Sequence, residues 1–139
     1  MDNKLPNPPK AVGNYTTIKR VNDLIYTSGH IPITEDIKYI GKIPNEQSTE
    51  DGYKAASLCA ELTLATLSEN YDLEKLIPLN VIGFVNCSDD YTDHPRVLNG
   101  FTDKLEEYFN SKATRSAVGV SSLPMNVSVE VQTIFYIDE

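Results

Sequence analysis

The clearest pattern of hydrophobic and polar positions lies near the end of the chain, between residues 115 and 137. From residue 127 to residue 137 hydrophobic side chains alternate with mostly polar ones, which predicts a long strand because successive side chains of a strand point to opposite faces. Residues 115–121 alternate in the same way and predict a shorter strand, with Arg115, Ala117 and Gly119 on one face. The segment 123–126 contains a proline and predicts a turn between the two strands.

Three more strands are predicted upstream. Residues 16–21 and 24–31 read as two strands joined by a two-residue hairpin turn at Asn22-Asp23, and a further short strand is possible near residue 40. Residues 76–86 predict an interior strand, because hydrophobic side chains occur on both of its faces. In an unbroken alternation one face of that strand carries Ile77, Leu79, Val81, Gly83 and Val85, and the other carries Ile82 and Phe84.

Two helices are expected between these strands. The first begins after Ser48 or Thr49, either of which can accept a hydrogen bond at a helix N-terminus, and runs to about residue 71. The second begins at Pro95 and ends before residue 111. Each has hydrophobic side chains at helical spacing, which predicts one buried face. The hydrophobic positions of the first helix are Ala55, Leu58, Cys59, Leu62, Ala65 and Leu67, and those of the second are Leu98, Phe101, Leu105, Tyr108 and Phe109.

The predicted order β-β-α-β-α-β-β describes a single α+β domain over residues 1–139, with five or six strands in a mixed sheet and two helices. Two helices can cover one face of such a sheet. The last strand has enough hydrophobic residues to need a packing partner on the other face of the sheet as well. An uncovered hydrophobic sheet face usually binds a partner, so we expect a homo-oligomer.

Composition and charge exclude several classes of protein. The formal net charge of −8 argues against general nucleic-acid binding and against an anionic membrane surface. The N-terminus has no hydrophobic signal region and no segment is hydrophobic enough to span a membrane, so we expect a soluble, cytoplasmic protein. The chain has two cysteines, Cys59 and Cys87, and two histidines, His30 and His94. They are too few and too irregularly spaced to predict a disulfide framework or a metal site.

Two charged residues in the C-terminal strands are candidates for chemistry. Arg115 offers a planar fork of donors that matches a carboxylate, and Glu130 can transfer a proton. An ordinary cross-strand ion pair, or two solvated surface charges, would account for the same residues. The residues alone leave these alternatives open.

The same segments, taken in order, resemble the RidA family, also called YjgF/YER057c/UK114. Arg115-Ser116-Ala117-Val118, followed by Leu123-Pro124 and Val129-Glu130-Val131, resembles the family's C-terminal signature. Gly13-Asn14-Tyr15, Ser28-Gly29-His30-Ile31-Pro32, Gly83-Phe84-Val85-Asn86 and Val97-Leu98-Asn99 match further segments of the pattern. Nearly the whole chain is covered, and the helix start and the Arg-Ser-Ala-Val-Gly-Val segment look most like a less studied branch.

The resemblance implies a chorismate-mutase-like fold and a homotrimer with three clefts between subunits. It also implies an imine and enamine deaminase without cofactor or metal, which hydrolyses reactive 2-imino acids such as 2-aminoacrylate/2-iminopropionate to 2-keto acids and ammonia. Arg115 would bind the substrate carboxylate, and Glu130 would position or activate the attacking water. The substrate-binding residues would be Tyr15 from the adjacent subunit, with Gly29, His30, Asn99 and the backbone of Ala117.

Four positions depart from the family pattern and put the substrate in question. Ala117 stands where many members have cysteine, and Gln132 replaces a second glutamate. Asn14 replaces a proline beside Tyr15, and His30 replaces a glutamine, where it could add pH dependence near neutrality or simply form a hydrogen bond. The alternatives are a non-catalytic trimer that binds or senses a small carboxylate metabolite, a ribonuclease or translation inhibitor, and a chaperone-like or partner-regulating trimer.

Overall fold

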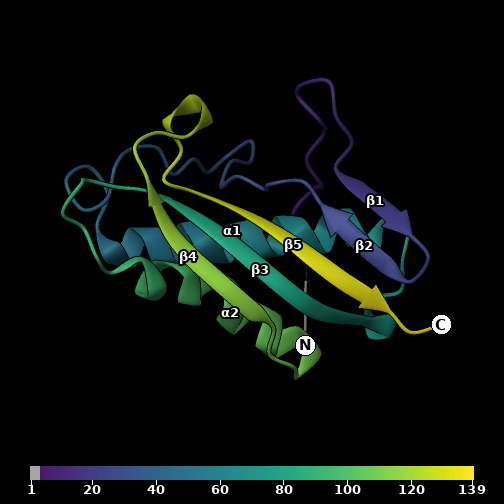
Figure 1. Ribbon diagram of the computed structural model, residues 1–139. Coiled ribbons are helices and arrows are strands. Elements are labelled where there is room, and N and C mark those ends of the chain that lie inside the picture. Colours follow the sequence, from purple (N-terminus) through teal and green to yellow (C-terminus); the bar gives the residue numbers. More distant parts are fainter. Residues whose placement is uncertain (1–3) are drawn as a thin grey trace.

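The computed structural model describes residues 4–139 and has the predicted order of strands and helices (Figure 1). Of the helices in this part of the chain, none has the length and hydrophobicity needed to cross a lipid bilayer. The strands are β1 (Ile18–Val21), β2 (Leu24–Thr27), β3 (Leu76–Asn86), β4 (Thr114–Val120) and β5 (Val129–Ile137), and the helices are α1 (Thr49–Ser68) and α2 (His94–Phe109).

The five strands form one mixed sheet in the order β1-β2-β5-β3-β4. All neighbours are antiparallel except β3 and β4, which are parallel. A parallel pair needs a crossover connection, and α2 supplies it. Figure 1 shows α1 and α2 behind the sheet, so both helices cover the same face. This is the α+β architecture that the sequence predicted.

Local sequence explains where the first elements begin and turn. Ser48 is the N-cap of α1: its hydroxyl accepts a hydrogen bond from the Asp51 N–H at 3.0 Å, and the Asp51 carboxylate accepts one from the Ser48 N–H at 3.1 Å. This reciprocal pair is a capping box. Between β1 and β2, Asn22 has a positive φ of 55°, a conformation that asparagine tolerates better than most residues. The predicted hairpin turn is therefore confirmed.

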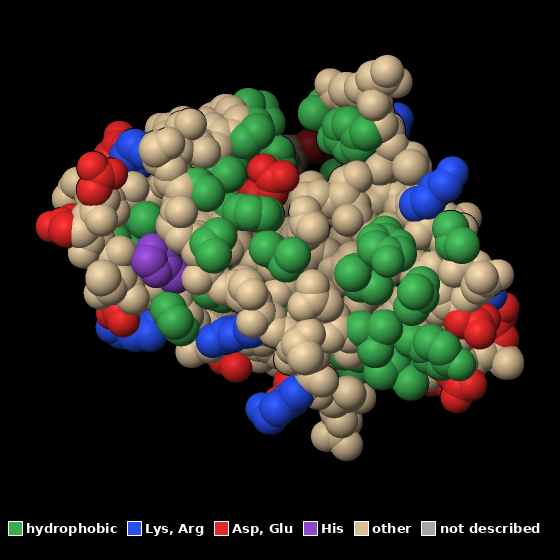
Figure 2. All heavy atoms as spheres, in the orientation of Figure 1, with side chains coloured by type: hydrophobic (Ala, Val, Ile, Leu, Met, Phe, Trp, Pro, Cys, Tyr) green, Lys and Arg blue, Asp and Glu red, His purple; other side chains and the backbone are tan. Residues whose placement is uncertain are grey.

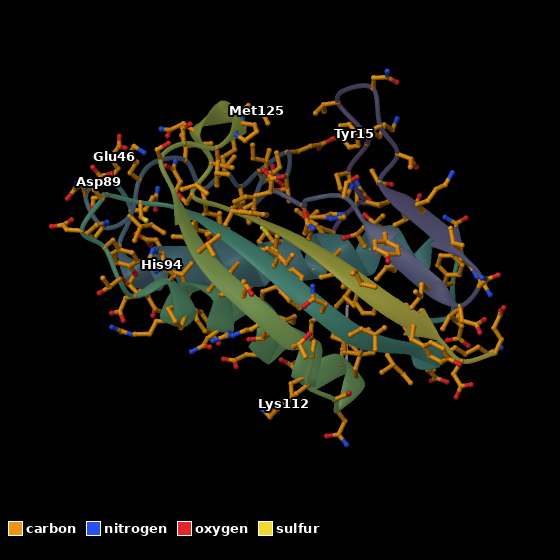
Figure 3. All side chains as sticks on the ribbon, in the orientation of Figure 1. Tyr15, Glu46, Asp89, His94, Lys112 and Met125 are labelled. Atoms are coloured by element: carbon orange, nitrogen blue, oxygen red, sulfur yellow. The ribbon has the colours of Figure 1, made fainter. Side chains whose placement is uncertain are left out.

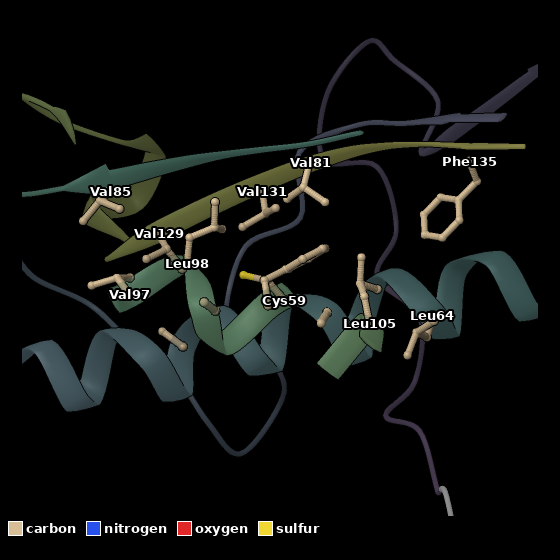
Figure 4. Packing of buried hydrophobic residues seen from close by; sticks show 14 of the residues in the cluster. Cys59, Leu64, Val81, Val85, Val97, Leu98, Leu105, Val129, Val131 and Phe135 are labelled. Atoms are coloured by element: carbon tan, nitrogen blue, oxygen red, sulfur yellow. The ribbon is translucent and has the colours of Figure 1, made fainter. Parts of the chain in front are cut away.

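The hydrophobic core fills the space between the sheet and the two helices (Figure 4). Side chains of β5 on one face, including Val129, Val131 and Phe135, are buried against the helices. All the predicted core positions of α1 are buried, and the thiol of Cys59 lies among them. In α2 the predicted Tyr108 and Phe109 are only half-buried, because they lie in the last turn.

One predicted face assignment is wrong. Between Pro78 and Asn80 the pairing of β3 with β5 shifts by one residue, so Leu79 is an extra residue on β3. Such a bulge reverses the alternation of side chains, and no period-two pattern can show it. Ile77 and Leu79 consequently lie on the face away from the helices, whereas Val81, Gly83 and Val85 face the core.

Hydrophobic side chains are left partly exposed on the sheet face that the helices do not cover. Figure 2 shows them gathered over the strands. Tyr26 is 47% exposed and Leu79 is 38% exposed. Leu24, Ile77 and Val118 share this uncovered face, as the register of the sheet requires. A surface of this kind on a single chain is typical of an interface with a partner.

Candidate functional site

The seven predicted site residues fall into two groups in the folded chain. One group lies where β4 meets α2, and consists of Asn99, Arg115 and Ala117. The other lies where the chain leaves β2 and passes β5, and consists of Tyr15, Gly29, His30 and Glu130. We call the two regions the Arg115 notch and the Tyr15 cavity.

The Arg115 notch is an open cavity of about 260 Å³ beside the C-terminal half of α2. Arg115 donates a hydrogen bond from Nη1 to the Thr102 hydroxyl at 3.0 Å, which holds the guanidinium against the helix. Asn99, one helical turn before, lines the same space. Asp103, Leu105, Glu106, Ser111, Lys112 and Ala113 complete the lining. A guanidinium held at one nitrogen still presents further N–H donors, so the notch can bind a carboxylate.

Ala117 follows Arg115 on the same face of β4, two residues along, as the alternation predicted. It pairs with Gly83 of β3 and is partly buried against the core. Its methyl side chain offers no polar group. Any contact of Ala117 with a substrate therefore depends on its backbone.

The Tyr15 cavity is larger, about 390 Å³, and mostly hydrophobic. Tyr15 and Met125 stand on two separate projections of the chain, and the surface is hollowed between them (Figures 2 and 3). Gly29 and the segment around it form part of the wall. The remaining lining residues are Pro9, Lys10, Val12, Thr17, Ser28, His30, Ile31, Ile33 and Lys38. The cavity can hold a small ligand with a hydrophobic portion.

Gly29 allows the Glu130 side chain to cross its backbone at very close range. A Cβ on Gly29 would lie 2.1 Å from the Glu130 Oε2 atom and 2.8 Å from its Cδ and Cγ atoms. No side chain tolerates such a contact, so glycine at position 29 is required for the observed carboxylate position. Neighbouring His30 fixes this segment to the sheet through two backbone hydrogen bonds with Val131, of 2.8 and 3.0 Å.

The environment of Glu130 suits a proton-transfer group. Glu130 lies on the uncovered face of β5, opposite Phe84 of β3, and is partly buried. Burial removes water from the carboxylate and raises the pKa of Glu130 above its ordinary value. A carboxyl group whose pKa is raised can exchange protons with a substrate or water more readily at physiological pH.

The imidazole of His30 is buried and hydrogen-bonded to helix α1. Its Nε2 atom lies 2.9 Å from the Thr66 hydroxyl of α1, its Nδ1 atom lies 3.0 Å from the Ser28 carbonyl, and the residue is 3% exposed. Burial lowers the pKa of His30 to about 4. The side chain therefore has the hydrogen-bonding role, rather than the pH dependence near neutrality that was its alternative.

Arg115 and Glu130 lie on opposite faces of the sheet. Arg115 pairs with Val81, whose side chain is buried under the helices, whereas Glu130 pairs with Phe84 on the uncovered face. Paired residues of neighbouring strands share a face. One chain thus holds two separate half-sites, with the Arg115 guanidinium in one and the Glu130 carboxyl group in the other. The cross-strand ion pair considered from the sequence is absent from residues 4–139.

Two further residues belong to these half-sites and were not singled out from the sequence. Thr102 accepts the hydrogen bond from Arg115. Its position one helical turn after Asn99 could have identified it from the sequence. Met125 is 58% exposed and has a positive φ of 56°, a strained conformation that often marks a functional loop. Within residues 4–139 no three histidine, cysteine or acidic side chains are grouped as metal ligands.

Comparison with known proteins supports one family. Residues 5–137 match the family described as Endoribonuclease L-PSP. The chain is 32% identical over 126 residues to AldR of Lactococcus lactis, named as a candidate regulator, which covers 91% of this chain and 89% of that protein. It is 25% identical over 134 residues to a 2-iminobutanoate/2-iminopropanoate deaminase of Dermatophagoides farinae, which covers 96% of this chain and 93% of that protein.

Solved structures show the same fold. Protein Atu1372 of Agrobacterium tumefaciens, whose function is unknown, superposes with a TM-score of 0.86 at 30% identity, over 91% of this chain and 85% of that one. The family match spans both half-sites, from the N-terminal segment that contains Tyr15 to the strand that contains Glu130. The chain therefore belongs to the Endoribonuclease L-PSP family, which is the RidA (YjgF) family that its sequence resembles.

Proposed function

We propose that this protein is an imine and enamine deaminase, which hydrolyses small 2-imino acids to 2-keto acids and ammonia in clefts between its subunits. The observation that carries the proposal is the partly buried Glu130 carboxyl against Gly29, with its raised pKa, beside a cavity of suitable size. Arg115 supplies the matching anchor for the carboxylate that every 2-imino acid has.

The reaction needs one water and no redox partner. The water oxygen forms a bond to the imine carbon, and Glu130 accepts a proton from that water. Glu130 passes that proton to the nitrogen, which gives a carbinolamine. The hydroxyl proton of this intermediate then moves to the nitrogen through Glu130 as the carbon–nitrogen bond breaks, so ammonia leaves and the keto acid remains. Arg115 and Asn99 hold the carboxylate end, so the water meets an oriented substrate.

The separation of the half-sites favours a cleft between two copies. Residues on opposite faces of one sheet cannot contact the same small molecule, whereas the Arg115 notch of one copy and the Tyr15 cavity of its neighbour can. The uncovered hydrophobic face offers the surface through which copies associate. We propose a homotrimer on these grounds, and rings with repeated identical interfaces follow from heterologous contacts of this kind.

A curated relative adds support from outside the structure. The Dermatophagoides farinae protein is named for the hydrolysis of 2-iminobutanoate and 2-iminopropanoate. At 25% identity the relative supports the reaction class more strongly than the choice of substrate. The proposal therefore names small 2-imino acids as a class.

The test is the rate of imine hydrolysis. An amino-acid oxidase generates 2-iminopropionate in place, and keto acid release is followed with a competing amine trap present. We expect wild type to accelerate release and Arg115→Ala to abolish the acceleration while leaving the assembly intact. Arg96→Ala is the matched control, because Arg96 is an exposed arginine that forms an ion pair with Asp93, the N-cap residue of α2. The absence of acceleration by wild type with several imino acids would contradict the proposal.

A second candidate is a non-catalytic assembly that binds a small carboxylate metabolite. The name of AldR as a candidate regulator favours it. Saturable binding of 2-keto acids, lost in Arg115→Ala, without any turnover of imines would separate it from the deaminase. A ribonuclease is disfavoured by the formal net charge of −8, and any RNA cleavage should then disappear on further purification.

A further inference from the structure

A thiol and an imidazole meet outside both half-sites. Cys87, just after β3, and His94, the first residue of α2, line a cavity of about 300 Å³ at the end of β4 away from Arg115. The Cys87 Sγ atom lies 3.5 Å from the His94 Nε2 atom. Ser88, Asp89, Tyr91, Gly119, Val120 and Ser121 form the rest of the lining. In this geometry the thiol can donate its proton to Nε2.

The imidazole is held in place by its neighbours. The ring of Tyr91 meets the ring of His94 edge-on, with centroids 5.5 Å apart and planes at 88°. The Tyr91 hydroxyl in turn hydrogen-bonds the Thr49 hydroxyl of α1 at 2.7 Å. Figure 3 shows His94 at this end of the molecule, near Asp89. An activated nucleophile is usually paired with a base that a third group holds in the required orientation.

The absence of a side chain at Gly119 leaves room for Cys87 and His94 to meet. A Cβ on Gly119 would lie 2.5 Å from His94 Nε2 and 2.9 Å from Cys87 Sγ. Both distances are shorter than any real Cβ contact. A side chain at this exposed position of β4 would therefore push the imidazole and the thiol apart.

We propose that Cys87 is a site of covalent thiol modification by small uncharged disulfides, with His94 as the base. The thiol sulfur attacks one sulfur of the disulfide as its proton passes to His94 Nε2. The disulfide bond breaks, a mixed disulfide forms on Cys87, and the departing thiolate takes the proton from His94. The disulfide is the oxidant and one of its halves is released as a thiol, so the exchange balances.

The surroundings of Cys87 explain why it needs a base. Burial raises the pKa of the Cys87 thiol, Asp89 acts in the same direction, and the ammonium of Lys42 opposes them. The thiol is therefore mainly protonated at rest, and proton transfer to His94 is what makes it nucleophilic. The other cysteine, Cys59, is 0% exposed in the core and serves as an internal reference.

The test is the rate of mixed-disulfide formation with 2-hydroxyethyl disulfide at pH 7, measured by mass spectrometry of the peptides that contain Cys87 and Cys59. We expect Cys87 to react at least about tenfold faster than Cys59 in wild type, because Cys59 reacts only after unfolding. His94→Asn and Gly119→Ala should each slow Cys87 by a similar factor. Arg96→Ala, an exposed change on the same helix, should leave the rate unchanged.

The comparison stays informative if a variant is destabilised. Unfolding exposes both thiols, so it would raise the rate at Cys59 as well as at Cys87, whereas loss of the base lowers the rate at Cys87 alone. Equal rates at Cys87 in wild type, His94→Asn and Gly119→Ala would overturn the proposal, as would equal rates at the two cysteines. Neither outcome depends on imine hydrolysis.

Discussion

Gly29 and Glu130 are matched to each other: the backbone at position 29 leaves a gap that the Glu130 carboxylate occupies, 2.1 Å from where a Cβ would be. The two residues are far apart in sequence and meet because His30 pairs with Val131. The position of the candidate proton-transfer group therefore depends on a residue without a side chain.

Gly29→Ala should displace the Glu130 carboxylate and lower imine hydrolysis by at least about tenfold, which corresponds to about 1.4 kcal/mol of transition-state stabilisation. The methyl group cannot fit unless Glu130 turns away. Steady-state kinetics would show the loss mainly in kcat, because Arg115 still binds the substrate carboxylate. Gly119→Ala is the control, since a Cβ there also meets side chains at short range, but those of His94 and Cys87, which lie outside both half-sites. Unchanged kinetics in Gly29→Ala would argue against Glu130 as the proton-transfer group.

Glu130→Gln should abolish hydrolysis and yet stabilise the fold at neutral pH. Burial raises the pKa of Glu130 in the folded state, so the charged form destabilises the fold above that pKa, and the penalty disappears as the pH falls through the folded pKa toward about 4.5. Melting temperatures of wild type and variant should thus differ most at pH 7 and converge in acid. Glu107→Gln, an exposed change on α2, is the control. A variant that melts below wild type at pH 7 would mean that the carboxylate is stabilising.

His30 should make the fold sensitive to mild acid. Its pKa is about 4 in the folded chain, against an ordinary value near 6.5, so the folded state resists protonation. The contribution is complete above about pH 6.5 and declines as the pH falls toward 4, by about 3 kcal/mol in total. His30→Gln, which keeps a group able to hydrogen-bond Thr66, should lose this part of the dependence. Denaturant titrations of both proteins between pH 7 and 4 would measure the difference, and parallel curves would contradict the assignment.

Leu79→Asp should break the assembly without unfolding the chain. Leu79 is 38% exposed on the uncovered face, so a charge there is tolerated in a single chain but not in a hydrophobic interface. Sedimentation should show a smaller particle, and imine hydrolysis should fall with it. Ile37→Asp places the same charge at a hydrophobic position in the loop before α1, which is 46% exposed. If Leu79→Asp sediments like Ile37→Asp and wild type, this face is not the interface.

The strands, helices and core were largely predictable because their signals are local. Ser48 and Asp51 form the N-cap of α1, and the alternation of β5 separates Val131 from Glu130 correctly. The bulge at Leu79 was not predictable, because the extra residue is defined only by the partner strand. A pattern within one strand therefore gives relative faces reliably only where pairing is regular.

The candidate site was less predictable because it depends on distant segments. The sequence singled out Arg115 and Glu130, but the register of β3 between their strands decides that they face opposite ways. The sequence also could not show that His30 turns toward Thr66, or that Cys87 meets His94, since both contacts follow from helix packing. The sequence showed which residues have suitable chemistry, but only the fold showed which of them lie close together.

The opposite orientation of Arg115 and Glu130 has a consequence for mixtures of defective chains. If each cleft takes its arginine from one copy and its glutamate from the next, a chain lacking Arg115 and a chain lacking Glu130 can complement each other when they assemble together. In randomly mixed rings about a quarter of the clefts would receive both intact residues. Two inactive proteins, unfolded and refolded as one solution, would then recover activity that neither has alone.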